Sequence, residues 1–155
     1  MRKLTSAEQT FIERLGQQSQ TDGISKIAGQ IWAALIVSDG PVSSAELMEM
    51  LHISKGSVST NTRLLEMLNI VERRSKPGER QDYFAIRDNP YSSLVEGQIK
   101  RFEAAIAVVD EAKKGITKKH ACSNLDDLGR FYALFHSSSR TLLEALQSSA
   151  QDSGD

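Results

Sequence analysis

Cysteine is almost absent from this chain, since Cys122 is the only one among 155 residues. A single cysteine excludes an internal disulfide, which agrees with a reducing, cytoplasmic compartment. No apolar run approaches the length of a membrane span, and residues 1–5 lead into an amphipathic segment rather than a signal-peptide core. We therefore expect a soluble protein without a membrane partner.

Motifs of catalysis and of cofactor binding are also missing. There is no glycine-rich phosphate loop and no recognisable nucleophile–base pair, although catalytic residues scattered along the chain would escape this search. His52, His120, Cys122 and His136 match no compact zinc pattern. Basic neighbours would favour the Cys122 thiolate, so this residue is either a redox trigger or an inert loop thiol. The sequence predicts no enzyme, no cofactor and no metal site.

Neither sign of charge dominates the whole chain. The formal net charge is -1, which gives no global signal for nucleic acid. Residues 53–80, however, hold six basic and three acidic side chains, so this segment carries +3 and the remainder carries -4. The composition, with 39% apolar, 6% aromatic and 25% charged residues, suits one domain of helices with charged outer faces.

The segment 53–69 has the pattern of an amphipathic helix after a tight turn. Ser54 is a natural N-cap, and a shorter helix precedes it, with Ser43 and Glu46 in capping-box spacing. At about 100° per residue, one side of the second helix is mostly apolar, comprising Val58, Asn61, Thr62, Leu65 and Leu68. The other side is small, hydroxylic and basic, comprising Gly56, Ser59, Thr60 and Arg63. This pattern predicts a helix-turn-helix.

Two strand-like runs follow at 70–75 and 81–86, around a Pro77-Gly78 turn. Amphipathic helices are expected at 5–18, 24–37 and 90–114 and from Ser123 onward, with 115–124 as a connection. The predicted fold is mainly α with a small β-hairpin: a single domain over 1–155, with a winged helix-turn-helix core at 24–88. Residues 1–20 and 90–149 would form a helical dimerisation arm, or else the internal core of a monomer.

The residues 53–61, 63–66 and 77–83 resemble the GbsR branch of the MarR-type transcriptional regulators. This resemblance implies a homodimeric regulator, more often a repressor, that binds double-stranded DNA. A two-fold dimer would bind a pseudopalindromic operator with half-sites about 10 to 11 bp apart. The alternative is a winged helix that docks onto protein and never contacts DNA.

The residues expected to bind DNA lie on the second helix and on the hairpin. Gly56 would let the backbone approach DNA, and Arg63 would either read guanine, contact a phosphate or pair with Glu66. Arg73 and Arg74 alternate across a strand, so at most one faces DNA, and we favour Arg74. Lys76 and Arg80 would contact phosphate or the minor groove, unless the hairpin is simply a solvated basic surface. The full set is Ser54, Lys55, Gly56, Ser57, Ser59, Thr60, Arg63, Arg74, Lys76 and Arg80.

Regulators of the resembled type often bind a small molecule between the winged helix and the dimer arm, and some GbsR-like members are associated with choline or glycine-betaine metabolism. Trp32, Tyr91, Phe102 and Tyr132 are the candidate effector-binding residues, because aromatic rings attract quaternary ammonium groups. Core packing is the alternative role for each of them. The sequence assigns no choline site.

Overall fold

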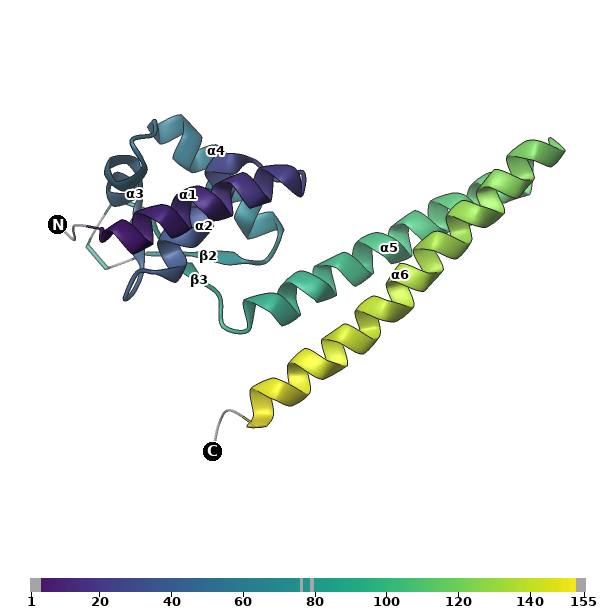
Figure 1. The fold of residues 1–155 in the computed structure, drawn as a ribbon. Helices are drawn as coiled ribbons and strands as arrows, with labels where there is room; N and C mark the ends of the chain where they lie inside the picture. Colours follow the sequence, from purple (N-terminus) through teal and green to yellow (C-terminus); the bar gives the residue numbers. More distant parts are fainter. Residues whose placement is uncertain (1–3, 76, 79, 153–155) are drawn as a thin grey trace. The chain divides into compact units, whose positions relative to one another are not determined.

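The computed structural model describes residues 4–75, 77–78 and 80–152, with the side chains of 150–152 excluded. It is mainly helical with a small antiparallel sheet, as predicted (Figure 1). The helices are α1 (Ser6–Thr21), α2 (Lys26–Ile36), α3 (Ser44–Leu51), α4 (Lys55–Met67), α5 (Pro90–Gly115) and α6 (Lys119–Asp152). The strands are β1 (Val42–Ser43), β2 (Val71–Arg74) and β3 (Tyr83–Ile86). The chain divides into two compact units, Met1–Pro90 and Tyr91–Asp155.

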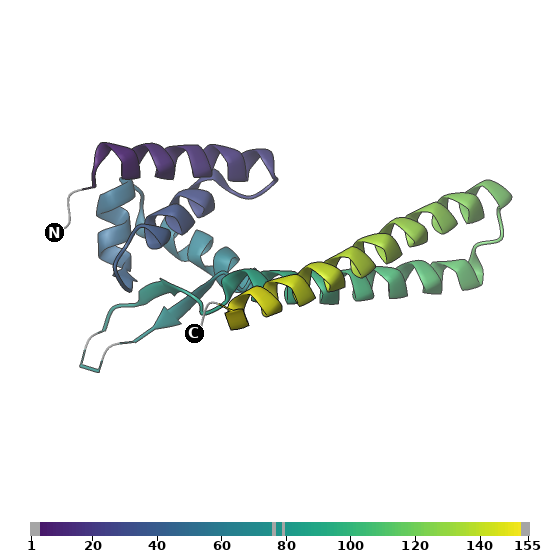
Figure 2. The same cartoon turned by 60° about the horizontal axis from the view of Figure 1, so that its bottom comes forward.

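The first unit is a winged helix-turn-helix. Its sheet has the order β1-β3-β2, and β2 and β3 form the predicted hairpin (Figure 2). Arg73 lies opposite Phe84, and Arg74 lies opposite Tyr83. The two-residue strand β1, which the sequence analysis did not predict, pairs Val42 with Phe84. This third strand joins the start of α3 to the wing.

Side chains at the turns define the helix boundaries in this unit. Thr5 and Ser43 each form a capping box, as predicted at Ser43, in which the hydroxyl accepts from the amide of a glutamate three residues later. Ser54 caps α4 in the same way, since its hydroxyl accepts from the Ser57 amide at 3.1 Å. Between α3 and α4, His52 takes a left-handed backbone with φ 52°, which makes the tight turn.

The hydrophobic core lies between α2, α3, α4 and the sheet. Its largest fully buried side chains include Ile31, Leu47, Leu65 and Phe84. Helix α1 packs along α2 at a seam of small residues. A Cβ added to Gly29 would lie 2.6 Å from Ser19 Cβ and 3.0 Å from Gly16 Cα, so the helices approach too closely for a side chain there.

The second unit is a helical hairpin of α5 and α6. Phe102 on α5 packs against Tyr132 and Phe135 on α6, with ring centroids 6.1 and 5.3 Å apart. The predicted start of the last helix at Ser123 is wrong. The helix begins at Lys119, because the turn that contains Cys122 already bonds its amide to the Lys118 carbonyl at 2.9 Å. Only residues 116–118 connect the two helices.

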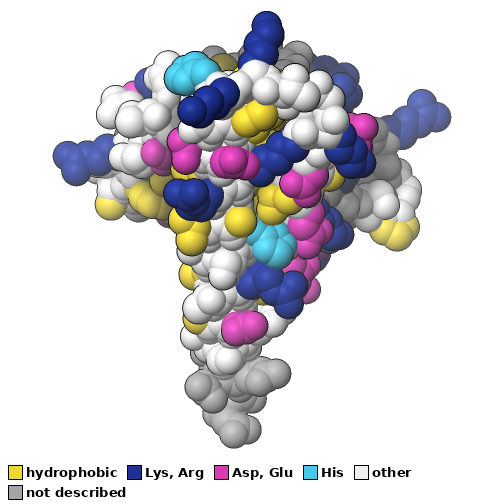
Figure 3. Space-filling model, turned by 90° about the vertical axis from the view of Figure 1, so that its right-hand side faces the viewer, with side chains coloured by type: hydrophobic (Ala, Val, Ile, Leu, Met, Phe, Trp, Pro, Cys, Tyr) yellow, Lys and Arg dark blue, Asp and Glu magenta, His cyan; other side chains and the backbone are white. Residues whose placement is uncertain are grey.

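Helix α6 exposes an apolar stripe that α5 leaves uncovered. Leu134 is 63% exposed, and Leu128, Phe131, Phe135 and Leu142 are each between 41% and 51% exposed. Figure 3 shows hydrophobic side chains exposed among charged ones on one face of the molecule. Within the described ranges, no helix combines the length and the apolar character that crossing a bilayer requires.

Candidate nucleic-acid interface

Helix α4 has one buried face and one exposed face, as its sequence predicts. Val58, Asn61, Thr62 and Leu65 are at most 7% exposed, whereas Leu68, just beyond the helix, is only partly buried. On the opposite side Gly56, Ser59, Thr60 and Arg63 are exposed. The helix therefore presents small, hydroxylic and basic groups to the surroundings.

Two polar side chains on the buried face satisfy their hydrogen bonds within the helix. Asn61 Nδ2 donates to the Ser57 carbonyl at 2.8 Å, and Thr62 Oγ1 donates to the Val58 carbonyl at 2.9 Å. Neither group needs a partner from another element, so both can pack inward without an unpaired polar atom. This explains how a helix with few apolar residues still anchors in the core.

Some side chains at the exposed side of α4 already form hydrogen bonds with described residues, and others form none. Ser54 and Ser57 bond to one another at the helix start, with 3.1 Å between their hydroxyl oxygens. Ser59, Thr60 and Arg63 make no side-chain hydrogen bond or ion pair with any described residue. These three groups are therefore available to an external partner.

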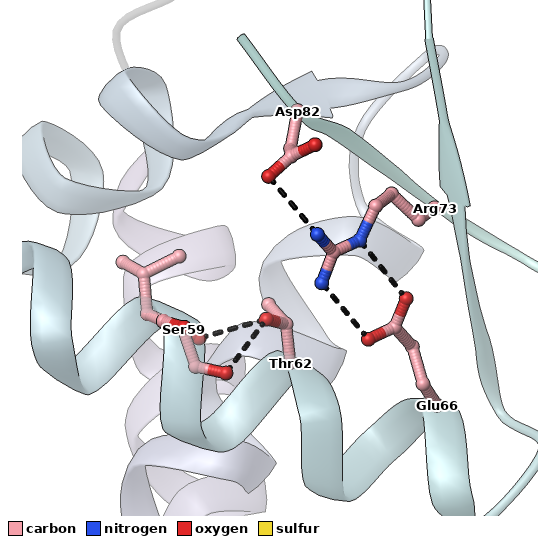
Figure 4. A network of polar contacts seen from close by, with 6 residues as sticks. Ser59, Thr62, Glu66, Arg73 and Asp82 are labelled. Carbon is pink, nitrogen blue, oxygen red and sulfur yellow. Dashed lines mark hydrogen bonds and ion pairs between the residues drawn. The ribbon is translucent and has the colours of Figure 1, made fainter.

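Arg73, in contrast, is not available to an external partner, because carboxylates hold its guanidinium from two directions (Figure 4). Its Nε and Nη2 donate to the two oxygens of Glu66 at 3.3 Å, and its Nη1 donates to Asp82 at 3.1 Å. The guanidinium also lies 5.5 Å from the centre of the Phe84 ring. The hydrogen bonds with Glu66, reinforced by Asp82, raise the pKa of Arg73. Arg73 thus braces the wing against α4.

The contacts of Arg73 concern two expectations from the sequence. One is an ion pair between Arg63 and Glu66, and the other is the choice between Arg73 and Arg74 as the DNA-facing residue. Glu66 gives both carboxylate oxygens to Arg73, so the ion pair considered between Arg63 and Glu66 is not formed. Arg73 and Arg74 are consecutive residues of β2, opposite Phe84 and Tyr83, and the choice of Arg74 as the DNA-facing residue stays a prediction. Arg74 is exposed and pairs with Glu72 at 2.6 Å. Sequence reasoning missed the roles of Glu66 and Asp82.

Two of the predicted wing residues remain, Arg80 and Lys76. Arg80 is exposed and has no ion pair with a described residue. Lys76 lies outside the described residues. Lys55, the first residue of α4, is exposed like Arg80, and the two side chains line the same hollow.

Two of the three candidate effector residues in the second unit lie together. Phe102 and Tyr132 share an aromatic cluster, but Tyr91 precedes Phe102 by three helical turns on α5 and is 50% exposed. Trp32 belongs to the first unit, where its Nε1 is buried without a hydrogen-bond partner among the described atoms. Phe102 and Tyr132 thus pack on each other, and an effector-binding role for any of the four residues stays a prediction.

The other candidate chemical groups are dispersed in the structure. Within the part of the chain that the structure describes, no three His, Cys, Asp or Glu side chains gather as metal ligands. Cys122 lies on α6 rather than in a loop, and its Sγ is 3.2 Å from the Ile116 carbonyl oxygen. His136 lies 3.1 Å from Glu103 on α5.

Comparison with known proteins agrees with this fold. The HTH-type transcriptional regulator MmpR5 of Mycobacterium tuberculosis is 32% identical over 107 residues, which cover 68% of this chain and 63% of that protein. The chain thus spans less than two thirds of that relative's length. A crystal structure of a transcriptional regulator superimposes with a TM-score of 0.83 over 92% of this chain and 99% of the other, at 23% identity, which shows a shared fold. No family model matches the chain.

A further solved structure, a MarR transcriptional regulator from Methanosarcina mazei Go1, is 14% identical, with 83% of this chain and 90% of the other covered. Its TM-score of 0.43 supports no closer comparison. The fold and the exposed face of α4 therefore define a winged helix-turn-helix protein. The named relative with which it shares sequence is a transcriptional regulator.

Proposed function

We propose that this protein is a cytoplasmic, sequence-specific DNA-binding transcriptional regulator of the MarR type, in its GbsR branch, and that it acts as a repressor. The observation that carries the proposal is the exposed face of α4, where Ser59, Thr60 and Arg63 are unengaged while the opposite face is buried. A recognition helix inserts such a face into the major groove, where hydroxyls and arginine read base edges. A docking surface for protein would more often be apolar.

Selection of sheared genomic DNA on the purified protein, followed by sequencing of the retained fragments, tests the proposal. At near-physiological salt, non-specific binding fades and a pseudopalindrome should be enriched. Repression would appear as lower transcription from a reporter that carries this sequence. Failure to enrich any sequence, with folded protein, would favour the docking module instead.

Arg63→Ala tests whether α4 supplies the specificity. Loss of a bidentate guanine contact should cost about 1–3 kcal/mol, or roughly five- to 150-fold in affinity for the enriched site. Binding to unrelated DNA should change little. Arg101→Ala is the matched control, because Arg101 is an exposed arginine on α5 that hydrogen-bonds only to Gln98 among the described residues. Equal affinity of Arg63→Ala and the parent for the enriched site would contradict the assignment.

We also propose that the protein is a homodimer and that the apolar stripe of α6 lies in its interface. Leu128, Phe135 and Leu142 are spaced by seven residues and are partly exposed, which is typical of helices that pair along one seam. Leu134→Glu and Phe135→Glu should shift the mass measured by light scattering from two chains to one. Val108→Glu is a control on α5, where Val108 is 70% exposed but stands alone. A monomeric parent would contradict the proposal.

A small-molecule effector is the last part of the proposal. Its support is limited to the resemblance and to the aromatic cluster around Phe102 and Tyr132. Choline and glycine betaine are the first probes, and the measurement is the DNA affinity with and without each compound. An effector should change that affinity, and Phe102→Leu should abolish the change while leaving DNA binding itself intact. A change that survives in Phe102→Leu would place the effector elsewhere.

A further inference from the structure

A hollow of about 240 Å³ lies between α3, the beginning of α4 and the wing. Its walls come from Ser44, Ala45 and Met48 on α3, from Lys55 on α4, and from Arg80, Gln81 and Asp82 in the wing. Two long basic side chains from separate elements thus line a single hollow. All of these lining residues belong to the first unit, which also carries the exposed face of α4.

The charged side chains that line this hollow differ in whether they form an ion pair with another described residue. Lys55 and Arg80 make no ion pair with any described residue. Asp82 is the one carboxylate among the lining residues, and it already accepts from Arg73 at 3.1 Å. Arg73 therefore occupies the Asp82 carboxylate, and neither Lys55 nor Arg80 is paired with an acidic side chain among the described residues. A hollow with this balance attracts a compact anion.

We propose that the hollow seats one phosphate of the DNA backbone, bound jointly by Lys55 and Arg80, and that Arg73 is a positioning residue that keeps Asp82 from neutralising them. The guanidinium would bond two phosphate oxygens, and the ammonium would act as a point charge. This inference rests on the proposed function and refines it. Arg80 is assigned to a phosphate beside α4, not to the minor groove.

The salt dependence of binding tests whether one phosphate is shared. The probe is a fluorescein-labelled 30-bp duplex of mixed sequence, titrated over a range of KCl concentrations with the parent, Lys55→Ala, Arg80→Ala and the double variant. Each neutralised phosphate contributes about 0.9 to the slope of log K against log salt. If Lys55 and Arg80 share one phosphate, either residue alone still neutralises it, so each single variant keeps nearly the parent slope. The double variant neutralises one phosphate fewer, and its slope falls by about 0.9 per bound subunit. The two losses in affinity should also be non-additive by about threefold or more.

Lys55→Ala combined with Arg63→Ala is the control pair. Arg63 lies eight residues along the same helix, about 12 Å away, so these two effects should be additive. Slope losses of about 0.9 for each single variant and 1.8 for the double would indicate two separate phosphates. That result would overturn the shared seat while leaving DNA binding established. A parent protein that binds no duplex at any salt would overturn the proposed function together with this inference.

A rescue experiment tests the role of Arg73 separately. Arg73→Gln frees the Asp82 carboxylate to pair with Lys55 or Arg80, and we expect duplex affinity to fall several-fold. The added change Asp82→Asn removes the competing charge and should restore affinity to within about twofold of the parent, whereas a loss of folding alone would not be rescued. Circular dichroism establishes that each variant is folded. Affinity that stays low in Arg73→Gln/Asp82→Asn would overturn the positioning role.

Discussion

Replacing Gly56 by alanine should raise stability and lower DNA affinity at once. Gly56 is the second residue of α4, and a Cβ added there would meet only Ser54 Oγ, at an ordinary 3.8 Å. Nothing inside the chain therefore demands glycine. Alanine is favoured over glycine by about 0.8–1.0 kcal/mol in a helix interior, and about half of this is expected near a helix start. The corresponding rise in melting temperature is about 1–2 °C.

The effect on DNA binding has the opposite sign if the α4 backbone approaches DNA at this point. A methyl group inserted into a close-packed contact costs about 1–3 kcal/mol, which is roughly five- to 150-fold in affinity. Thermal unfolding followed by circular dichroism measures the first quantity, and fluorescence anisotropy with the enriched duplex measures the second. Gly115→Ala is the control, since Gly115 also has open space where a Cβ would lie but is the last residue of α5.

The two readouts together can refute the reasoning. If Gly56→Ala binds the duplex as tightly as the parent, the backbone at this position does not approach DNA. If the variant is less stable than the parent, the space around Gly56 is not as open as the structure indicates. A coupled rise in stability and fall in affinity would instead show that glycine at this position serves binding rather than folding.

Three further predictions concern stability. Gly29→Ala should destabilise the protein by about 1–3 kcal/mol, because the new Cβ would lie 2.6 Å from Ser19 Cβ; chemical denaturation measures this, and an unchanged midpoint would contradict the close seam. Ser43→Ala should cost about 0.5–2 kcal/mol in the same assay, since it removes the cap of α3, and a cost no greater than that of the exposed Ser6→Ala would contradict a capping role. The hydrogen bond from Lys26 lowers the pKa of Glu13 below its ordinary value of 4.5. The stabilisation that this hydrogen bond gives the folded protein is therefore present above pH 4.5 and is lost as the pH falls through the lowered pKa. Glu13→Gln should therefore flatten the acid side of the stability curve between about pH 5 and pH 3, and an unchanged acid limb would count against this coupling.

Local sequence signals predicted the starts of α1, α3 and α4 to within one residue. Thr5, Ser43 and Ser54 each bond to an amide three residues later, so the signal and its structural partner lie within one turn. The same local logic failed at the start of α6. Ser123 and Asp126 imitate a helix start, but α6 runs through them from Lys119, and Asp126 instead pairs with Lys113 on α5 at 2.9 Å.

Features that depend on distant residues were not predictable in this way. Strand β1 exists only because Val42 and Ser43 meet β3 some forty residues later, and two residues carry no strand pattern of their own. Likewise, alternation in β2 separates Arg73 from Arg74 but does not reveal which one meets Glu66 and Asp82. The periodicity of α4, by contrast, spans three turns and correctly predicted which side is buried.

The seam between α1 and α2 determines how a mechanical signal would travel through the first unit. At Gly16 and Gly29 the two helices approach closely, and the side chains of Ser19 and Gln30 already fill the space beside them, which leaves little room for a rotamer change to absorb a displacement. Helix α2 in turn packs on α4. A displacement of α1 would therefore move α2 with it, and through α2 it would change where the exposed face of α4 points.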